Sequence, residues 1–348
     1  MLKIIFAGTP ECAAPALEAI AKRHRVVGVL TNPPASRGRH RELVPSPVMQ
    51  AAQKLIDNGT LPPHTPIFAP EKITDEVRSA IAETEADLMV CFAFGKIFGP
   101  KTLSLFPLGS INIHPSLLPR WRGCAPVPAA ILARDAETGI TIQKIVREMD
   151  AGDILAQVRF PLDGTETADS LLERAARDSA PLVLEVLDAI ENGTAQATPQ
   201  DSSRATYSAL LCKEDGEIDW TASAEDIDAK IRAFTSWPGA WTRKGEQILM
   251  ILEAAVWKGT QEQAFIAAEG SGGLQKTAHP DTPAFAPGTV IGTDKRNGIL
   301  VAAGTGTLAL KKLQWRTKKP LDWKSFLNGS RDFPGSVLGG EPKTETEG

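Results

Sequence analysis

With 348 residues, of which 42% are hydrophobic, the chain is long enough for two domains that each bury a core. Its formal net charge of −4 excludes a uniformly basic nucleic-acid coat protein, although basic clusters occur locally. The four cysteines are far apart and form no Cys-x-x-Cys pair, which argues against a disulfide framework and favours free, buried thiols. The sequence has no signal segment or long apolar run, so we expect a soluble cytoplasmic protein.

Strand and helix patterns alternate through the first half of the chain. Several of the strand patterns are continuous apolar runs, which are typical of a sheet whose two faces are both covered. The alternation predicts an α/β fold for residues 1–190, a Rossmann-like, doubly wound and mostly parallel sheet. The expected strands span 2–6, 25–30, 86–92, 108–114, 140–145 and 153–158, and the expected helices span 12–22, 45–54 and 167–190.

The pattern changes after residue 190. Polar, turn-rich residues 191–206 indicate a linker. Beyond them, short strand patterns separated by Gly- and Asn-containing turns predict a small OB-like antiparallel β-barrel over residues 207–335. We expect a long loop at 262–285 and a disordered tail at 336–348. The expected barrel strands are 248–251, 254–257, 288–291, 298–302 and 307–313.

The strand expected at 108–114 ends in Asn112-Ile113-His114, followed by Pro115. Residues i and i+2 of a strand face the same way, so Asn112 and His114 are predicted to point into one cleft at the strand end. Asp150 follows in the segment Asp150-Ala151-Gly152-Asp153. Alone, the histidine could be a satisfied strand-end residue and the aspartate a turn cap. Together, an amide, an imidazole and a carboxylate favour acyl transfer to an amine.

Two groups of basic residues indicate contacts with anions. Arg120 and Arg122 flank Trp121 beside the predicted site, and we expect them to form an anion-facing lip. A basic run over residues 37–41 and a cluster of lysines with interleaved tryptophans in the second half suggest a nucleic-acid surface, although solvated faces would look similar. The second cluster contains Lys311, Lys312, Arg316, Lys318, Lys319 and Lys324, with Trp315 and Trp323.

The stretch from Asn112 to Pro119, with its downstream Asp-x-Gly, resembles the signature of the folate-dependent formyltransferase family. Matches in the second half, at 218–220 and 231–234, narrow the resemblance to the branch that acts on methionyl-tRNA. The likeness covers nearly the whole chain, to about residue 335. The other matching segments are 6–10, 45–48, 116–123, 125–126 and 135–139.

The resemblance implies transfer of a formyl group from 10-formyltetrahydrofolate to the α-amine of methionyl-initiator tRNA. Asn112 and His114 match the family's pair that binds the formyl oxygen, and Asp150 matches its carboxylate. A carboxylate beside His114 favours the imidazolium form, which donates to the oxyanion, and Asp150 can relay the amine's proton through water. The resemblance implies no metal and does not require a partner subunit, so we expect a monomer.

The resemblance also assigns binding residues. Arg39 aligns with the family's basic loop that grips the acceptor stem, with Arg37 and Arg41 as support. The basic cluster of the barrel, which the charge pattern indicates, adds Lys311, Lys312, Lys318 and Lys319 as expected tRNA contacts. The chain departs from the family at Pro34-Ala35-Ser36, at Arg41-Glu42 and in the loop at 262–285. The implied folate contacts are Phe92, Ala93, Phe94, Gly95, Ile97, Ser116, Leu117, Leu118 and Pro119.

Three alternatives stay open on the sequence. The chain could formylate a small amine, such as a glycinamide nucleotide or an amino-sugar nucleotide, and the basic loop and barrel argue most clearly against the former. It could be an RNA-binding module on an inactive fold, which would not require Asn112, His114 and Asp150 together. It could also be a deformylase-like hydrolase, if water replaced the amine.

Overall fold

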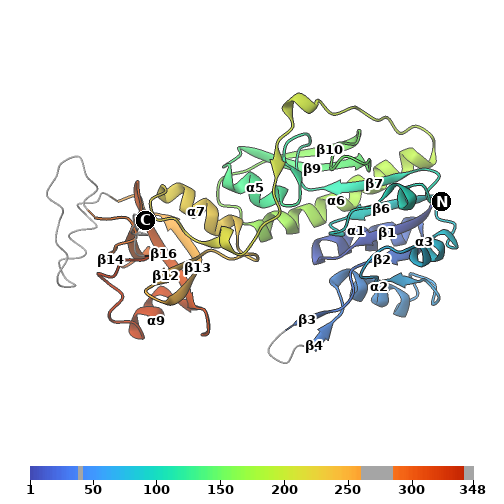
Figure 1. Ribbon diagram of the computed structural model, residues 1–348. Coiled ribbons are helices and arrows are strands. Elements are labelled where there is room, and N and C mark those ends of the chain that lie inside the picture. Colours follow the sequence, from blue (N-terminus) through green and yellow to red (C-terminus); the bar gives the residue numbers. More distant parts are fainter. Residues whose placement is uncertain (38–41, 260–284, 341–348) are drawn as a thin grey trace, which may run out of the picture. The chain divides into compact units, whose positions relative to one another are not determined.

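The computed structural model describes residues 1–37, 42–259 and 285–340 (Figure 1). The chain divides into two compact units. The predicted domain borders at 190, 206 and 335 stay predictions, and residues 262–284 and 341–348 of the expected loop and tail lie outside the described part. Unit 1 contains Met1–Ala130, Asp135–Asp163 and Ser170–Leu210, and unit 2 contains Ile131–Arg134, Gly164–Asp169 and Leu211–Gly348.

Unit 1 is built on a seven-stranded sheet with the order β10-β9-β7-β6-β1-β2-β5. The five strands from β7 to β5 are parallel to one another. At one edge of the sheet, β9 runs antiparallel to both of its neighbours, β7 and β10. The predicted doubly wound, mostly parallel sheet is therefore confirmed. Its strands are β1 (Lys3–Gly8), β2 (Arg25–Leu30), β5 (Ile67–Phe68), β6 (Leu88–Phe92), β7 (Ser110–His114), β9 (Glu137–Lys144) and β10 (Ile154–Pro161).

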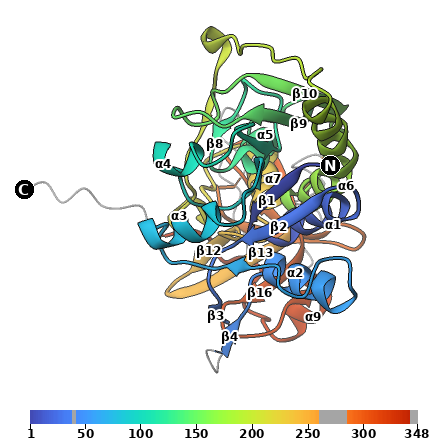
Figure 2. The same ribbon diagram turned by 90° about the vertical axis from the view of Figure 1, so that its right-hand side faces the viewer.

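Helices cover both faces of this sheet, which explains the continuous apolar runs of its central strands. Figure 2 shows α1 and α6 on one side of the sheet, and α3 and α4 on the other. All five residues of β6 are buried. The helices are α1 (Ala14–Arg23), α2 (Pro47–Asp57), α3 (Asp75–Ala82), α4 (Pro100–Leu103), α5 (Pro126–Leu132) and α6 (Ala168–Glu191).

Short elements that the sequence did not predict complete unit 1. The polar segment after β2 contains a two-stranded hairpin, β3 (Ala35–Arg37) with β4 (Glu42–Val44). A further small pair joins β8 (Arg122–Gly123) to β11 (Tyr207–Ser208) in parallel. This pair ties the segment after α6 to the loop that follows β7, and it thereby shapes the site described below.

Unit 2 consists of a curled antiparallel sheet with helices packed on it. This sheet corresponds to the small antiparallel barrel that the sequence predicted. The prediction of two separate strands at 248–251 and 254–257 is wrong, because both segments belong to one strand, β13. Register shifts between Ile251 and Ala254 interrupt its alternation and disguise its length. The elements are α7 (Ala224–Ala233), β12 (Trp241–Lys244), β13 (Gln247–Val256), β14 (Val290–Asp294), β15 (Gly298–Ala302), β16 (Thr307–Trp315), β17 (Leu321–Asp322) and α9 (Trp323–Asn328).

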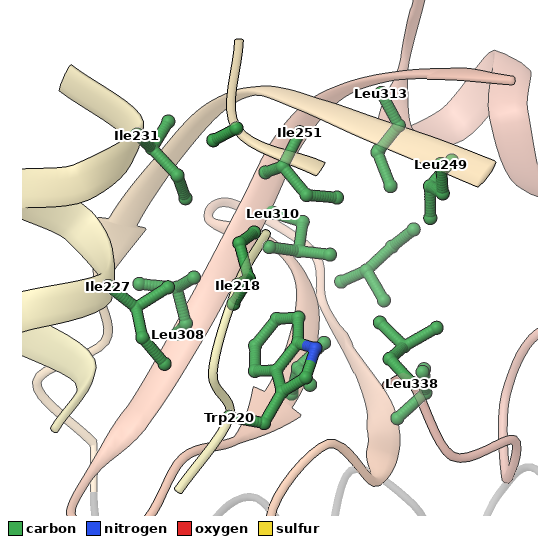
Figure 3. Packing of buried hydrophobic residues seen from close by; sticks show 14 of the residues in the cluster. Ile218, Trp220, Ile227, Ile231, Leu249, Ile251, Leu308, Leu310, Leu313 and Leu338 are labelled. Atoms are coloured by element: carbon green, nitrogen blue, oxygen red, sulfur yellow. The ribbon is translucent and has the colours of Figure 1, made fainter. Parts of the chain in front are cut away.

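The core of unit 2 lies between α7 and the concave side of this sheet. Figure 3 shows Ile227 and Ile231 of the helix facing aliphatic side chains of β13 and β16, with Trp220 beneath them. The Trp220 indole is buried, and its Nε1 donates to Thr242 Oγ1 at 2.9 Å, which satisfies its polar atom. Core residues thus come from both ends of unit 2, from Ile218 to Leu338.

The cysteines differ in part from the expectation of free, buried thiols. All four are free, but only Cys91 is buried, whereas Cys124 and Cys212 are exposed. Burial raises the pKa of the Cys91 thiol to about 12, so this group stays protonated at neutral pH. Within the described residues, no helix is long and apolar enough to cross a membrane.

Candidate active site

Asn112, His114 and Asp150 lie together at the carboxyl end of β7, as the sequence predicted. Asn112 Nδ2 lies 3.4 Å from Asp150 Oδ1, and His114 Nδ1 lies 3.6 Å from the same oxygen. The strand register explains the geometry: Asn112 pairs with Gln143 of β9 and His114 pairs with Thr141, so the four side chains share one face of the sheet. Asp150 reaches this face from the loop between β9 and β10.

The second ring nitrogen of His114 fixes the state of the imidazole. His114 Nε2 lies 2.8 Å from the main-chain oxygen of Trp121, and a carbonyl oxygen can only accept. Nε2 therefore carries a hydrogen, and Nδ1 is the nitrogen that faces Asp150. Only 5% of the His114 side chain is exposed, so Nδ1 faces this carboxylate in a largely water-excluded site.

Two short hydrogen bonds anchor the Asp150 carboxylate, while its contacts to the other two predicted residues are long. Oδ1 accepts from Gln143 Nε2 at 2.8 Å, and Oδ2 accepts from the Gly123 main-chain nitrogen at 2.8 Å. The contacts of 3.4 and 3.6 Å to Asn112 and His114 are weak by comparison. The hydrogens of Asn112 Nδ2 and protonated His114 Nδ1 are therefore not held by short hydrogen bonds to Asp150 and are available to a developing oxyanion.

Gln200 and Arg122 form a supporting layer that the sequence did not predict. Gln200 Nε2 donates to the main-chain oxygens of Asp150 and Gly152 at 2.8 and 2.7 Å, and it lies 3.1 Å from Gln143 Oε1. Arg122 donates to Gln200 Oε1 through Nε at 3.0 Å and Nη2 at 2.9 Å. This network holds both the carboxylate and its loop in place. Gln143 could have been found as the neighbour of Asn112, but Gln200 lies in the polar segment that we expected to be a linker.

The expected anion-facing lip is wrong. Arg122 is only 1% exposed and points inward to Gln200. Arg120 makes a bidentate contact with Asp135 through bonds of 2.8 and 2.5 Å, and its guanidinium lies 4.3 Å from the centre of the Trp121 ring. Arg122 is thus committed to an internal partner, whereas the Arg120 side chain is 44% exposed but already paired with a carboxylate.

Backbone geometry explains the glycine of the Asp-x-Gly motif. Asp150 has φ +52°, in the left-handed region that aspartate tolerates better than most residues. A Cβ on Gly152 would lie 1.9 Å from the main-chain oxygen of Lys144. Only glycine lets the chain pass so close to β9 on its return toward β10, and this close passage places Asp150 over Gln143.

We expect Gly152→Ala to lower both stability and turnover, because the added methyl group must push the loop away from Lys144. The overpacking costs about 1–3 kcal/mol of unfolding free energy, and Asp150 moves with the loop. Thermal unfolding and kcat are the measurements. Gly99→Ala is the matched control, since a Cβ at Gly99 meets nothing within 4 Å. Equal melting temperatures for the two variants would contradict this account of the motif.

The expected folate residues divide into side chains that are buried and groups that remain accessible. Phe92 and Phe94 are each 1% exposed, and Phe94 stacks on Phe98 with ring centres 5.2 Å apart, so these rings belong to the core. Ser116 is fully buried, and its Oγ donates to the Arg120 main-chain oxygen at 2.6 Å. Ile97 is 80% exposed. The rings of Phe92 and Phe94 are therefore not accessible to a ligand, which would meet the main chain of this loop.

A cavity of about 530 Å³ lies beside the loop after β7 in unit 1. Leu117, Leu118 and Pro119, three of the expected folate residues, line it. Asn112, His114 and Asp150 do not line it, so this cavity is not the centre of the predicted chemistry. The loop that carries Trp121 lines this cavity, and the main-chain oxygen of Trp121 is also the hydrogen-bond partner of His114.

The expected tRNA contacts fall partly outside the described residues, as Arg39 and Arg41 do. Arg37 is the last residue of β3. In unit 2, Lys312, Lys318 and Lys319 are exposed, and Lys311 lies 3.8 Å from Glu253. Of the interleaved aromatic residues, Trp315 and Trp323 are half-buried and pack against the core of unit 2.

Comparison with known proteins identifies both halves of the chain. Residues 2–187 match the family described as formyl transferase, and residues 210–331 match its C-terminal domain. The chain is 49% identical to a methionyl-tRNA formyltransferase of Treponema denticola over 332 residues, which are 95% of this chain and 98% of that protein. The enzyme of the same name from Marinobacter nauticus is 36% identical over 97% of this chain and its own full length.

Solved structures of low identity share the fold. HypX from Aquifex aeolicus in complex with tetrahydrofolic acid aligns with a TM-score of 0.58 at 15% identity, over 94% of this chain and 47% of its own. The sugar 3N-formyltransferase WlaRD aligns with a TM-score of 0.57 at 18% identity, over 92% of this chain and 99% of its own. The family matches and the nearly full-length relatives agree with the clustered amide, imidazole and carboxylate, and the chain therefore belongs to the methionyl-tRNA formyltransferase family.

Proposed function

We propose that the protein transfers a formyl group from 10-formyltetrahydrofolate to the α-amine of methionyl-initiator tRNA and so supplies formylmethionyl-tRNA for translation initiation. The observation that carries the proposal is the cluster of Asn112, His114 and Asp150 in a chain that is up to 49% identical to enzymes of this name over almost its full length. The long contacts to Asp150 leave polar hydrogens available for a reacting oxygen.

The reaction begins when the neutral amine of the methionyl group attacks the formyl carbon. The carbonyl oxygen gains negative charge as the tetrahedral intermediate forms. Asn112 Nδ2 and protonated His114 Nδ1 are the two donors that can bind this oxyanion, because both point to the same side of β7. The hydrogen bond to the Trp121 carbonyl keeps the His114 ring fixed, so no reorientation is needed when the charge develops.

Asp150 completes the reaction by handling the proton that the attacking amine loses. Its carboxylate is 14% exposed, so water can reach it and carry the proton from the amine. Collapse of the intermediate then breaks the bond from the formyl carbon to the folate nitrogen, which takes up a proton as it leaves. Gln143 and the Gly123 main chain hold the carboxylate during this exchange.

Substrate binding follows from the accessible groups. The main chain of residues 93–97 and the side chains of Leu117 and Pro119 are the proposed contacts of the folate. The basic run with Arg37, Arg39 and Arg41, and the exposed lysines of unit 2, are the proposed contacts of the tRNA phosphates. We expect the protein to work as a monomer in the cytoplasm, where its tRNA substrate is charged, and size-exclusion chromatography tests the oligomeric state.

The deciding experiment offers the enzyme 10-formyltetrahydrofolate with either methionyl-initiator tRNA or a small amine such as an amino-sugar nucleotide. We expect transfer to the tRNA alone. Formylation of the amino-sugar nucleotide without formylation of the tRNA would replace the proposal by the small-amine reaction.

Arg39→Ala tests the tRNA contact separately from the chemistry. We expect the KM for tRNA to rise on the order of tenfold with kcat nearly unchanged, and the salt dependence of binding to become shallower by about one charge. Lys54→Ala, which removes an exposed positive charge from α2, is the matched control and should leave the KM unchanged. Equal effects of the two variants would show that only net charge matters.

A further inference from the structure

A histidine of unit 1 is buried without a hydrogen-bond partner, far along the chain from the active-site residues. His24 follows the last residue of α1, and only 1% of its side chain is exposed. Neither ring nitrogen has a hydrogen-bond partner among the residues that the structure describes. A buried imidazole normally has at least one, because losing the hydrogen bonds to water costs free energy. The two nitrogens therefore remain available to bind a ligand.

Two carboxylates of α6 face this ring. His24 Nε2 lies 3.9 Å from Asp188 Oδ1, and His24 Nδ1 lies 3.9 Å from Glu191 Oε2. These distances are too long for hydrogen bonds. Asp188 and Glu191 stand three residues apart on the helix, so their side chains share one face. One ring nitrogen and one oxygen from each carboxylate lie within 4.8 Å of one another.

The outer oxygens of the carboxylates are already occupied, which orients the inner ones toward the histidine. Arg23 Nη2 donates to Asp188 Oδ2 at 2.6 Å, and the amino group of Met1 contacts Glu191 Oε1. Asp188 Oδ1 and Glu191 Oε2 are the oxygens left facing the ring. The side chains of Asp188 and Glu191 are 34% and 32% exposed, so an ion could enter from solvent between them.

We propose that His24, Asp188 and Glu191 form a binding site for a divalent transition-metal ion such as Zn²⁺, which joins the end of α1 to the end of α6. Imidazole with two carboxylates is a ligand set that suits Zn²⁺, and ligand atoms around a tetrahedral ion lie about 3.3 Å apart. A small inward movement of two partly exposed side chains closes the present gaps. The nitrogen that does not bind the ion keeps its hydrogen and can donate it to a carboxylate.

The protonation state of the histidine agrees with this role. Burial lowers the pKa of His24 below its ordinary value, and the nearby Asp188 offsets this only in part. The neutral ring, the form that binds metals, therefore predominates at neutral pH. The site is remote in sequence from Asn112, His114 and Asp150, and the ion would stabilise the fold of unit 1 without taking part in formyl transfer.

The test is Zn²⁺ binding to the chelator-treated, full-length protein, measured by calorimetry and by thermal unfolding. We expect the wild type to bind one more equivalent of Zn²⁺ than either Asp188→Asn or Glu191→Gln. In each variant the affinity of this site for Zn²⁺ should fall at least tenfold, so that the site is no longer filled under the same conditions. We also expect Zn²⁺ to raise the wild-type melting temperature by several degrees and to leave that of the variants unchanged. Both substituted residues are partly exposed, so the variants should fold.

His64→Gln, which removes an exposed histidine, is the control and should bind Zn²⁺ as the wild type does. Equal stoichiometry in the wild type and both carboxylate variants would overturn the proposal, since it would place the binding elsewhere, for example at the exposed Cys124 and Cys212. An unchanged melting temperature of the wild type with saturating Zn²⁺ would also overturn it, because an ion that joins two helices of the folded state must stabilise that state.

Discussion

Replacing Asp150 by asparagine is expected to reduce kcat by about 10²–10⁴-fold, with little change in KM. Asparagine has the same shape and tolerates the left-handed backbone at φ +52°, so the loop should keep its course. Its amide oxygen can accept from only one of the two donors that hold the carboxylate, Gln143 Nε2 and the Gly123 main-chain nitrogen, so the free energy of unfolding should fall by about 1–3 kcal/mol. The amide cannot accept the proton that the attacking amine loses, nor can it offset the charge of a protonated His114.

Asp153→Asn is the matched control for this variant. Asp153 lies in the same loop, but its carboxylate is 41% exposed and pairs with Lys144 at 3.5 Å on the surface. Loss of this pair should cost under about 1 kcal/mol and leave kcat unchanged. Comparable losses of kcat in both variants would mean that the charge of the loop, rather than the carboxylate beside Asn112 and His114, supports the reaction.

Replacing His114 by alanine is expected to reduce kcat by about 10²–10³-fold, since one of the two oxyanion donors disappears. The substitution also removes the partner of the Trp121 carbonyl, so we expect the free energy of unfolding to fall by about 1–3 kcal/mol. Single-turnover kinetics with saturating tRNA and folate isolate the chemical step from this loss of stability.

Asn112→Ala separates the loss of an oxyanion donor from the loss of stability. Among the residues that the structure describes, its amide makes only the long 3.4 Å contact to Asp150, so removing it should lower kcat by a similar factor while the melting temperature stays close to that of the wild type. Retention of more than a third of the wild-type kcat in either variant would exclude that side chain as an oxyanion donor.

Much of the fold could be predicted because its signals are local. The continuous apolar runs at 25–30 and 86–92 predicted buried strands, and the alternation with helices predicted a mostly parallel sheet. Two features weakened these signals. Register shifts in β13 made one strand look like two, and short elements such as β3, β4, β8 and β11 offer too few residues for a periodic pattern.

The sequence alone determined that Asn112 and His114 share a side of their strand, because the alternation of a strand is a property of the backbone. Only the tertiary structure decided what surrounds them. Gln200 reaches Gln143 across 57 residues of sequence, and Arg122 turns inward to Gln200 across 78. The approach of His24 to α6 is of the same kind. Such contacts depend on how distant segments pack, and no local pattern of residue types records that packing.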